Sequence, residues 1–213
     1  MPKDFSLQNL FRDLEYTIFG TEVHQLLFKV SPPEENKRVL EMGCGCGKFG
    51  IAYALAGCDV VMMDIDEQVI DYARRIRDAA NSLQGHKSPT FIYSGDLFKM
   101  TYKADSFDLV FNEGVPQHWP DEERRQGAID LMVKVSRRDV IVIGNNGLRE
   151  EEQEADRNFK FTYEGMPPHR RCFIPDELFM SLRKAGLEGV EVGPVTPGKI
   201  EDSYLIGGWG RKT

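Results

Sequence analysis

The chain has 213 residues, of which 41% are hydrophobic and 29% are charged, a balance near that of soluble globular proteins. Its 27 Lys and Arg residues against 34 Asp and Glu residues give a net charge of −7, which disfavours a nucleic acid partner. No segment approaches the ~20 consecutive apolar residues of a membrane span, and the N-terminus lacks the apolar region of a signal peptide. We therefore expect one cytoplasmic domain over residues 1–213, with no membrane partner.

The four cysteines form neither a CxxC pair nor a spacing of Cys and His ligands typical of a metal site. This favours a reducing compartment. Cys44 and Cys46 are too close in sequence to pair easily, and we expect them to be small fillers.

Apolar residues recur every three to four positions in the first 30 residues, which predicts one or two amphipathic helices over residues 1–30. Ser31-Pro32-Pro33 ends this segment. Short apolar segments then alternate with helical ones. We expect strands over 38–42, 59–64, 90–93, 107–111 and 139–143, and helices over 49–56, 68–83, 121–135 and 175–185.

Two last strands, at about 188–195 and 203–209, are separated by Pro194, Pro197 and Gly198, which predicts a hairpin. The alternation before them implies parallel strands joined by right-handed crossovers. The predicted fold class is a doubly wound α/β fold with a mostly parallel seven-stranded sheet, one antiparallel strand from the C-terminal hairpin, and helices on both faces. Such sheets bind ligands beyond the carboxyl ends of their strands.

A glycine-rich segment, Glu41-Met42-Gly43-Cys44-Gly45-Cys46-Gly47, follows the first expected strand. Glycines at every second position let the backbone turn sharply and approach a nucleotide-like ligand. Gly45, Gly47 and Gly50 also spell the GxGxxG pattern of dinucleotide-binding proteins. Glu41 argues against that ligand, because a carboxylate repels a pyrophosphate but suits the ammonium group of S-adenosylmethionine.

The spacing Glu41-x-Gly43-x-Gly45-x-Gly47 resembles the first motif of class I S-adenosylmethionine-dependent methyltransferases, and later segments match that family in order over about residues 36–145. The resemblance implies S-adenosylmethionine as the cofactor. It also implies a set of cofactor-binding residues: Glu41 at the methionine end, Gly43, Gly45 and Gly47 in the turn, Asp64 and Ile65 at the ribose, Asp96 and Leu97 at the adenine, and Asn112 and Gly114 under the transferable methyl group.

Two of these acids have alternative structural roles. Asp64 or Asp66 could cap the helix that follows, and we favour Asp66 for capping. Asp96 could equally be a turn residue.

Methyl transfer needs a base only if the acceptor must lose a proton. His118, just past the fourth expected strand, is the first catalytic candidate because its ordinary pKa suits neutral pH. The alternative is that His118 only packs at the start of the next helix. Glu113 is the second catalytic candidate, with an orienting or solvated carboxylate as its alternative. Asn145-Asn146 stands where some relatives carry an Asp-Asn metal pair, so we expect no metal.

Residues 145–173 form a long insertion after the fifth expected strand and are expected to be a lid or binding loop. Together with Trp119, three of its residues are the candidates for binding the acceptor: Tyr163, Arg170 and Arg171. A guanidinium matches a carboxylate or phosphate, although a surface ion pair is the alternative for both arginines.

The function that these features favour is methyl transfer to a small-molecule acceptor. A protein or RNA methyltransferase is the main alternative. An NAD(P)-dependent oxidoreductase and a non-catalytic, cofactor-binding partner of another methyltransferase are further ones. The sequence indicates neither the acceptor nor the oligomeric state.

Overall fold

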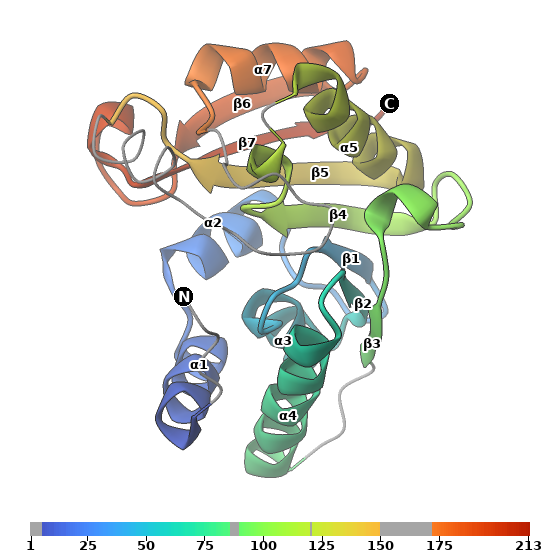
Figure 1. Ribbon diagram of the computed structural model, residues 1–213, viewed down its shortest axis with the longest axis vertical. Helices are drawn as coiled ribbons and strands as arrows, with labels where there is room; N and C mark the ends of the chain where they lie inside the picture. Colours follow the sequence, from blue (N-terminus) through green and yellow to red (C-terminus); the bar gives the residue numbers. More distant parts are fainter. Residues whose placement is uncertain (1–5, 86–89, 120, 150–171) are drawn as a thin grey trace. The chain divides into compact units, whose positions relative to one another are not determined.

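The computed structural model describes residues 6–85, 90–119, 121–149 and 172–213 (Figure 1). These residues belong to two units, Met1–Thr101 and Tyr102–Thr213. The α-helices are α1 (Leu7–Phe19), α2 (Glu22–Val30), α3 (Lys48–Leu55), α4 (Glu67–Gln84), α5 (Glu122–Val135) and α7 (Pro175–Lys184). The strands are β1 (Arg38–Met42), β2 (Asp59–Asp64), β3 (Thr90–Ser94), β4 (Phe107–Glu113), β5 (Ser136–Asn145), β6 (Glu188–Pro194) and β7 (Leu205–Arg211). Three short 3₁₀ helices are η1 (Leu97–Lys99), η2 (Pro116–His118) and η3 (Ile200–Asp202).

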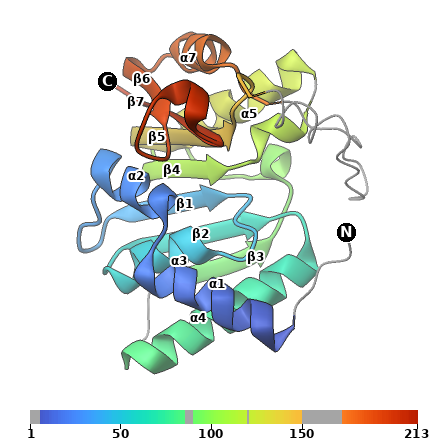
Figure 2. The same ribbon diagram turned by 90° about the vertical axis from the view of Figure 1, so that its left-hand side faces the viewer.

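The first unit is built on three parallel strands in the order β3-β2-β1. Leu40 lies beside Val61, and Val61 beside Phe91, so the three strands end near the same level. Helices α3 and α4 pack on these strands, and α1 lies against both helices (Figure 2). Buried β-branched and other apolar side chains in β1 and β2 explain why these segments form strands inside the unit.

The second unit is built on four strands in the order β4-β5-β7-β6, with β7 antiparallel to both of its neighbours. Helix α5 packs on β5, and α7 packs on β6 and β7. The contact between α7 and β7 needs Gly208, because a Cβ there would lie 2.7 Å from Leu182 Cδ1. Gly186, at φ +92°, follows the last turn of α7 and ends the helix.

The predicted fold class, a mostly parallel seven-stranded sheet with an antiparallel strand from a C-terminal hairpin, is confirmed. The N-terminal segment contains two helices, because Gly20 at φ +81° ends α1 and Thr21 begins α2. The predicted start of β5 was wrong, because the strand begins at Ser136, three residues before residue 139. The first residues of β5 are polar, which is not typical of a buried strand, so the sequence analysis left them out. In the structure, Arg137 forms an ion pair with Asp108 on the neighbouring strand β4.

One further expectation, the lid over 145–173, falls largely outside the described residues. That the whole chain is one domain also stays a prediction. In the part of the chain that the structure describes, none of the helices combines the length and the apolar character required to cross a bilayer.

Gly50, in the first turn of α3, permits a close approach of this helix to β1 and β2. A Cβ at this position would overlap Met62 Sδ and lie 2.6 Å from Glu41 Oε2. We expect Gly50→Ala to lower the free energy of unfolding by ~1–3 kcal/mol, measured by urea denaturation, because overpacking outweighs the gain in helix propensity. Gly193→Ala is the control, since its Cβ would meet Trp209 at an ordinary 3.5 Å. Equal stability of wild type and Gly50→Ala would contradict this account of the packing.

Candidate functional site

The glycine turn (residues 43–47) joins β1 to α3. Gly43, Gly45 and Gly47 have φ values of +72°, +52° and +76°, a region that side-chain-bearing residues rarely adopt. The N–H groups of Gly43 and Cys44 donate to Met63 O at 2.7 and 2.8 Å, and these bonds attach the turn to the end of β2. Within the described residues, no atom lies within 4 Å of a Cβ built on Gly45, so a ligand can approach the backbone there.

Glu41 lies beneath the first turn of α3. Its side chain is buried, with the residue 1% exposed, and its Oε2 accepts from Gly50 N at 2.9 Å. A carboxylate is favourable here, because the first N–H groups of a helix lack partners within the helix and carry partial positive charge. Glu41 therefore orients the start of α3. Its predicted role at the methionine end stays a prediction.

His24 of α2 supports the same helix start. Its Nδ1 accepts from Thr21 N at 2.9 Å, so Nε2 carries the proton and faces Lys48 O at 3.3 Å. Burial lowers the pKa of His24, because it disfavours the charged imidazolium; the nearby Lys48 charge acts in the same direction, and the hydrogen bond to Lys48 O opposes both. His24 is therefore neutral at neutral pH.

Asp64, the last residue of β2, connects three segments. Its Oδ2 accepts from Gly45 N at 3.0 Å, its Oδ1 accepts from Asp66 N at 3.1 Å, and its backbone oxygen accepts from Gly95 N at 2.8 Å. Each carboxylate oxygen has two acceptor positions, so both oxygens keep room for a further donor. Ile65 follows with an exposed side chain.

Asp66 caps α4, as predicted. Its Oδ1 accepts from Gln68 N at 2.8 Å and from Val69 N at 3.4 Å. The two neighbouring acids thus have different structural roles, and Asp64 is not the cap.

Asp96 follows β3 and begins η1. Its Oδ1 accepts from Phe98 N at 2.9 Å, and its Oδ2 lies 3.5 Å from Lys99 Nζ. The turn role that the sequence left open is therefore present. Leu97 is buried beside it. The predicted adenine contacts of Asp96 and Leu97 stay predictions.

The second unit carries the remaining candidates at the end of β4. Asn112 is 1% exposed and its Nδ2 lies 2.9 Å from Met132 Sδ, so its side chain packs under α5. Glu113 is half-buried, and Gly114, at φ +80°, donates to Ile143 O at 2.8 Å. Gly114 thereby attaches the end of β4 to β5.

His118 ends η2 and is half-buried, whereas Trp119 is buried, with Arg124 lying 5.7 Å from its ring centroid. Gln117, which the sequence analysis missed, holds η2 in place. Its Oε1 accepts from Asn145 N at 2.8 Å, and its Nε2 donates to Asn145 Oδ1 at 3.3 Å. Its position three residues after Gly114 was the only available signal.

The side chain of Asn146 forms hydrogen bonds within the protein through both its nitrogen and its oxygen. Its Nδ2 donates to Ile200 O at 2.6 Å and to Ser203 O at 2.9 Å, and its Oδ1 accepts from Leu148 N. Across the described ranges no group of three His, Cys, Asp or Glu side chains is arranged to hold a metal ion. The remaining acceptor candidates, Tyr163, Arg170 and Arg171, lie outside the described residues.

Comparisons with known proteins identify the family. Residues 39–139 match the model of a family described as a methyltransferase domain. The ubiquinone biosynthesis O-methyltransferase of Aromatoleum aromaticum is 25% identical over 175 residues, which are 80% of this chain and 72% of that protein. An uncharacterized protein of Haemophilus influenzae is 28% identical over 120 residues, 53% of this chain and 46% of that protein, so this chain spans about half of that relative.

Among solved structures, the magnesium protoporphyrin IX methyltransferase of Synechocystis PCC 6803 with bound S-adenosylhomocysteine has the same fold, with a TM-score of 0.67 at 18% identity over 99% of this chain and 90% of that one. Residues 39–139 therefore match a methyltransferase domain in sequence, and the chain shares its fold with S-adenosylmethionine-dependent methyltransferases. The predicted family, enzyme class and cofactor are thereby confirmed, and the GxGxxG pattern does not mark a nicotinamide oxidoreductase.

The neutral state of His24 makes stability depend on pH. Because its folded pKa lies below the unfolded value of about 6.5, its contribution is fully present above that value and is lost as the pH falls toward the folded pKa. We expect the wild-type free energy of unfolding to decrease from about pH 7.5 to about pH 5.5, and to decrease less in His24→Gln. Urea denaturation at both pH values measures this, and parallel decreases in the two proteins would contradict it.

Proposed function

We propose that this methyltransferase binds S-adenosylmethionine at the glycine turn, Asp64 and Asp96, and transfers its methyl group to a small-molecule acceptor. The observation that carries the binding site is the position of Asp64, whose carboxylate lies against the open backbone of Gly45. Support for a small acceptor comes from the relative named as a ubiquinone biosynthesis O-methyltransferase and from the acidic net charge of −7.

The described residues fit this cofactor chemically. The ribose offers two adjacent hydroxyl donors, and Asp64 has an acceptor position left on each oxygen. The adenine offers an exocyclic amine, for which Asp96 is the matching acceptor. Glu41, by fixing the start of α3, sets the position of the glycine turn from below.

When bound, S-adenosylmethionine supplies an electrophilic methyl group on a sulfonium whose positive charge falls as the new bond forms. The protein's task is to align the acceptor with the methyl carbon and to exclude water. For a hydroxyl acceptor, His118 accepts the proton at its imidazole nitrogen. Gln117 keeps that histidine in place by holding η2 against Asn145.

The first test is calorimetric titration with S-adenosylhomocysteine, with NADH as the control ligand. We expect micromolar binding of the former alone. Asp64→Ala should weaken it by roughly 10- to 100-fold, the effect of losing hydrogen bonds to a charged group. Asp66→Ala is a matched control: it removes the neighbouring cap and costs about 1 kcal/mol of stability, but should leave the affinity within about threefold. Binding of NADH instead, or equal effects of both variants, would contradict the assignment.

The second test concerns the base. With an acceptor found by screening phenols, carboxylic acids and amines for formation of S-adenosylhomocysteine, His118→Gln should lower kcat by roughly 10²- to 10⁴-fold. The affinity for S-adenosylhomocysteine should not change. Glu113→Gln is the comparison variant. A larger loss of kcat in Glu113→Gln, with His118→Gln near wild type, would assign the proton to Glu113.

A further inference from the structure

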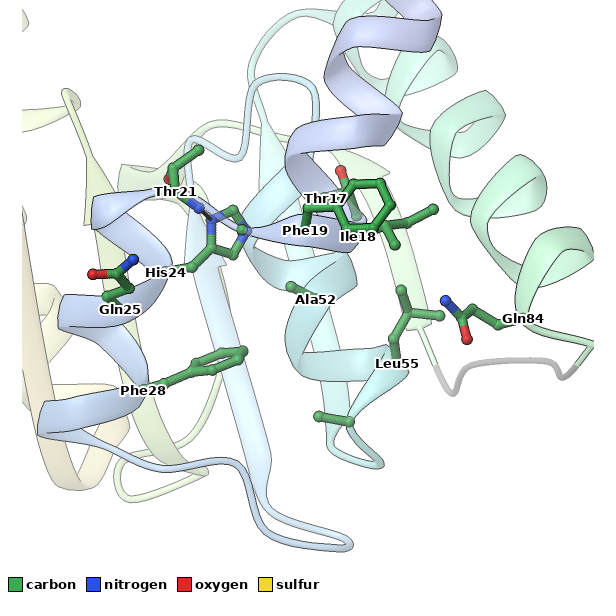
Figure 3. Close-up of a pocket in the computed structure, with 12 residues that line it drawn as sticks. Thr17, Ile18, Phe19, Thr21, His24, Gln25, Phe28, Ala52, Leu55 and Gln84 are labelled. Carbon is green, nitrogen blue, oxygen red and sulfur yellow. Dashed lines mark hydrogen bonds between the residues drawn. The ribbon is translucent and has the colours of Figure 1, made fainter.

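A pocket of about 380 Å³ lies in the first unit, outside the glycine turn (Figure 3). We call it the N-terminal pocket. It is lined by the end of α1, the connection to α2, α2 itself, the second half of α3 and the end of α4. From α3 it takes Ala52, Leu55 and Ala56, toward the end of the helix opposite the glycine turn. Neither Asp64 nor Asp96 is among the lining residues, so the pocket is separate from the proposed cofactor site.

The N-terminal pocket combines apolar walls with neutral polar groups, among them Thr17 and Thr21. Phe28 projects from α2 toward Ala52 and Leu55 of α3 (Figure 3). The exposed carboxamides of Gln25 and Gln84 add neutral hydrogen-bonding groups at its edge. No Asp, Glu, Lys or Arg is among the described residues that line it.

The one titratable residue in the lining is also neutral. His24 accepts from Thr21 N through Nδ1 (Figure 3). Its Nε2 faces Lys48 O, so both ring nitrogens are engaged by the backbone. Its buried ring, 4% exposed, therefore presents an uncharged edge to the pocket. An ionic ligand would lose its hydration here without gaining a counter-charge.

We propose that the N-terminal pocket is a second ligand site, which takes an uncharged, mostly apolar small molecule with one hydrogen-bonding group. Its volume falls within the range of small-molecule sites, and such sites combine apolar walls with a few polar groups. The apolar part of the ligand contacts Phe28, Ala52 and Leu55. The polar group bonds to Gln25 or Gln84, whose amides offer both donors and acceptors.

Two probes with the same ring skeleton test the proposal. N-phenyl-1-naphthylamine is neutral and has one N–H, and 8-anilino-1-naphthalenesulfonate adds a sulfonate to that skeleton. We expect the neutral probe to bind the full chain saturably, measured by its fluorescence increase, and the anionic probe to bind at least about tenfold more weakly. Saturating S-adenosylhomocysteine should leave the neutral probe bound.

Ala56→Phe places an aromatic ring in the pocket from an exposed position and should weaken the neutral probe at least about tenfold. Ser82→Phe is the matched control, because Ser82 is exposed on α4 and does not line the pocket. Circular dichroism establishes that both variants fold. The proposal is overturned if the neutral probe does not bind saturably, if S-adenosylhomocysteine displaces it, if the anionic probe binds equally well, or if Ala56→Phe leaves binding unchanged. Since none of these outcomes requires methyl transfer, the proposal is tested separately from the proposed function.

Discussion

Hydrogen bonds from the end of β2 organise the first unit around the glycine turn. Met63 O accepts from two N–H groups of the turn, Asp64 accepts from Gly45 through its side chain, and Asp64 O accepts from Gly95 after β3. The loops that follow three neighbouring parallel strands are thus joined through two residues. The Asp64 side chain is thereby fixed by backbone groups, which cost little entropy to order once the strands have formed.

The first turn of α3 is held from two further directions. Glu41 accepts from Gly50 N from below, and His24 faces Lys48 O from α2. Both groups are buried, so each must keep its partner in the folded protein. Helix α3 consequently forms a fixed element, with the glycine turn at its beginning and the N-terminal pocket at its other end.

The sequence predicted most of the fold, because the physical causes there are local. The bounds of β1 and β2 agree residue by residue with the apolar segments at 38–42 and 59–64, and Asp66 is the cap that its position indicated. Long-range bonds were harder to predict. Nothing near Gln117 indicates its partner Asn145, 28 residues away, and nothing near His24 indicates Lys48, 24 residues away. The burial of Glu41 was equally hidden, since it depends on the absence of a side chain at Gly50.

Gly43, Gly45 and Gly47 of the glycine turn have left-handed backbone conformations, so a side chain added at any of these three positions brings strain. Substitution of these glycines therefore carries a backbone penalty whatever side chain is introduced. During divergence, new acceptor preferences therefore have to arise in other segments, where a changed side chain carries no backbone penalty. Under the proposed function, a chain of this kind can acquire new acceptors while the backbone of the glycine turn beside its cofactor stays the same.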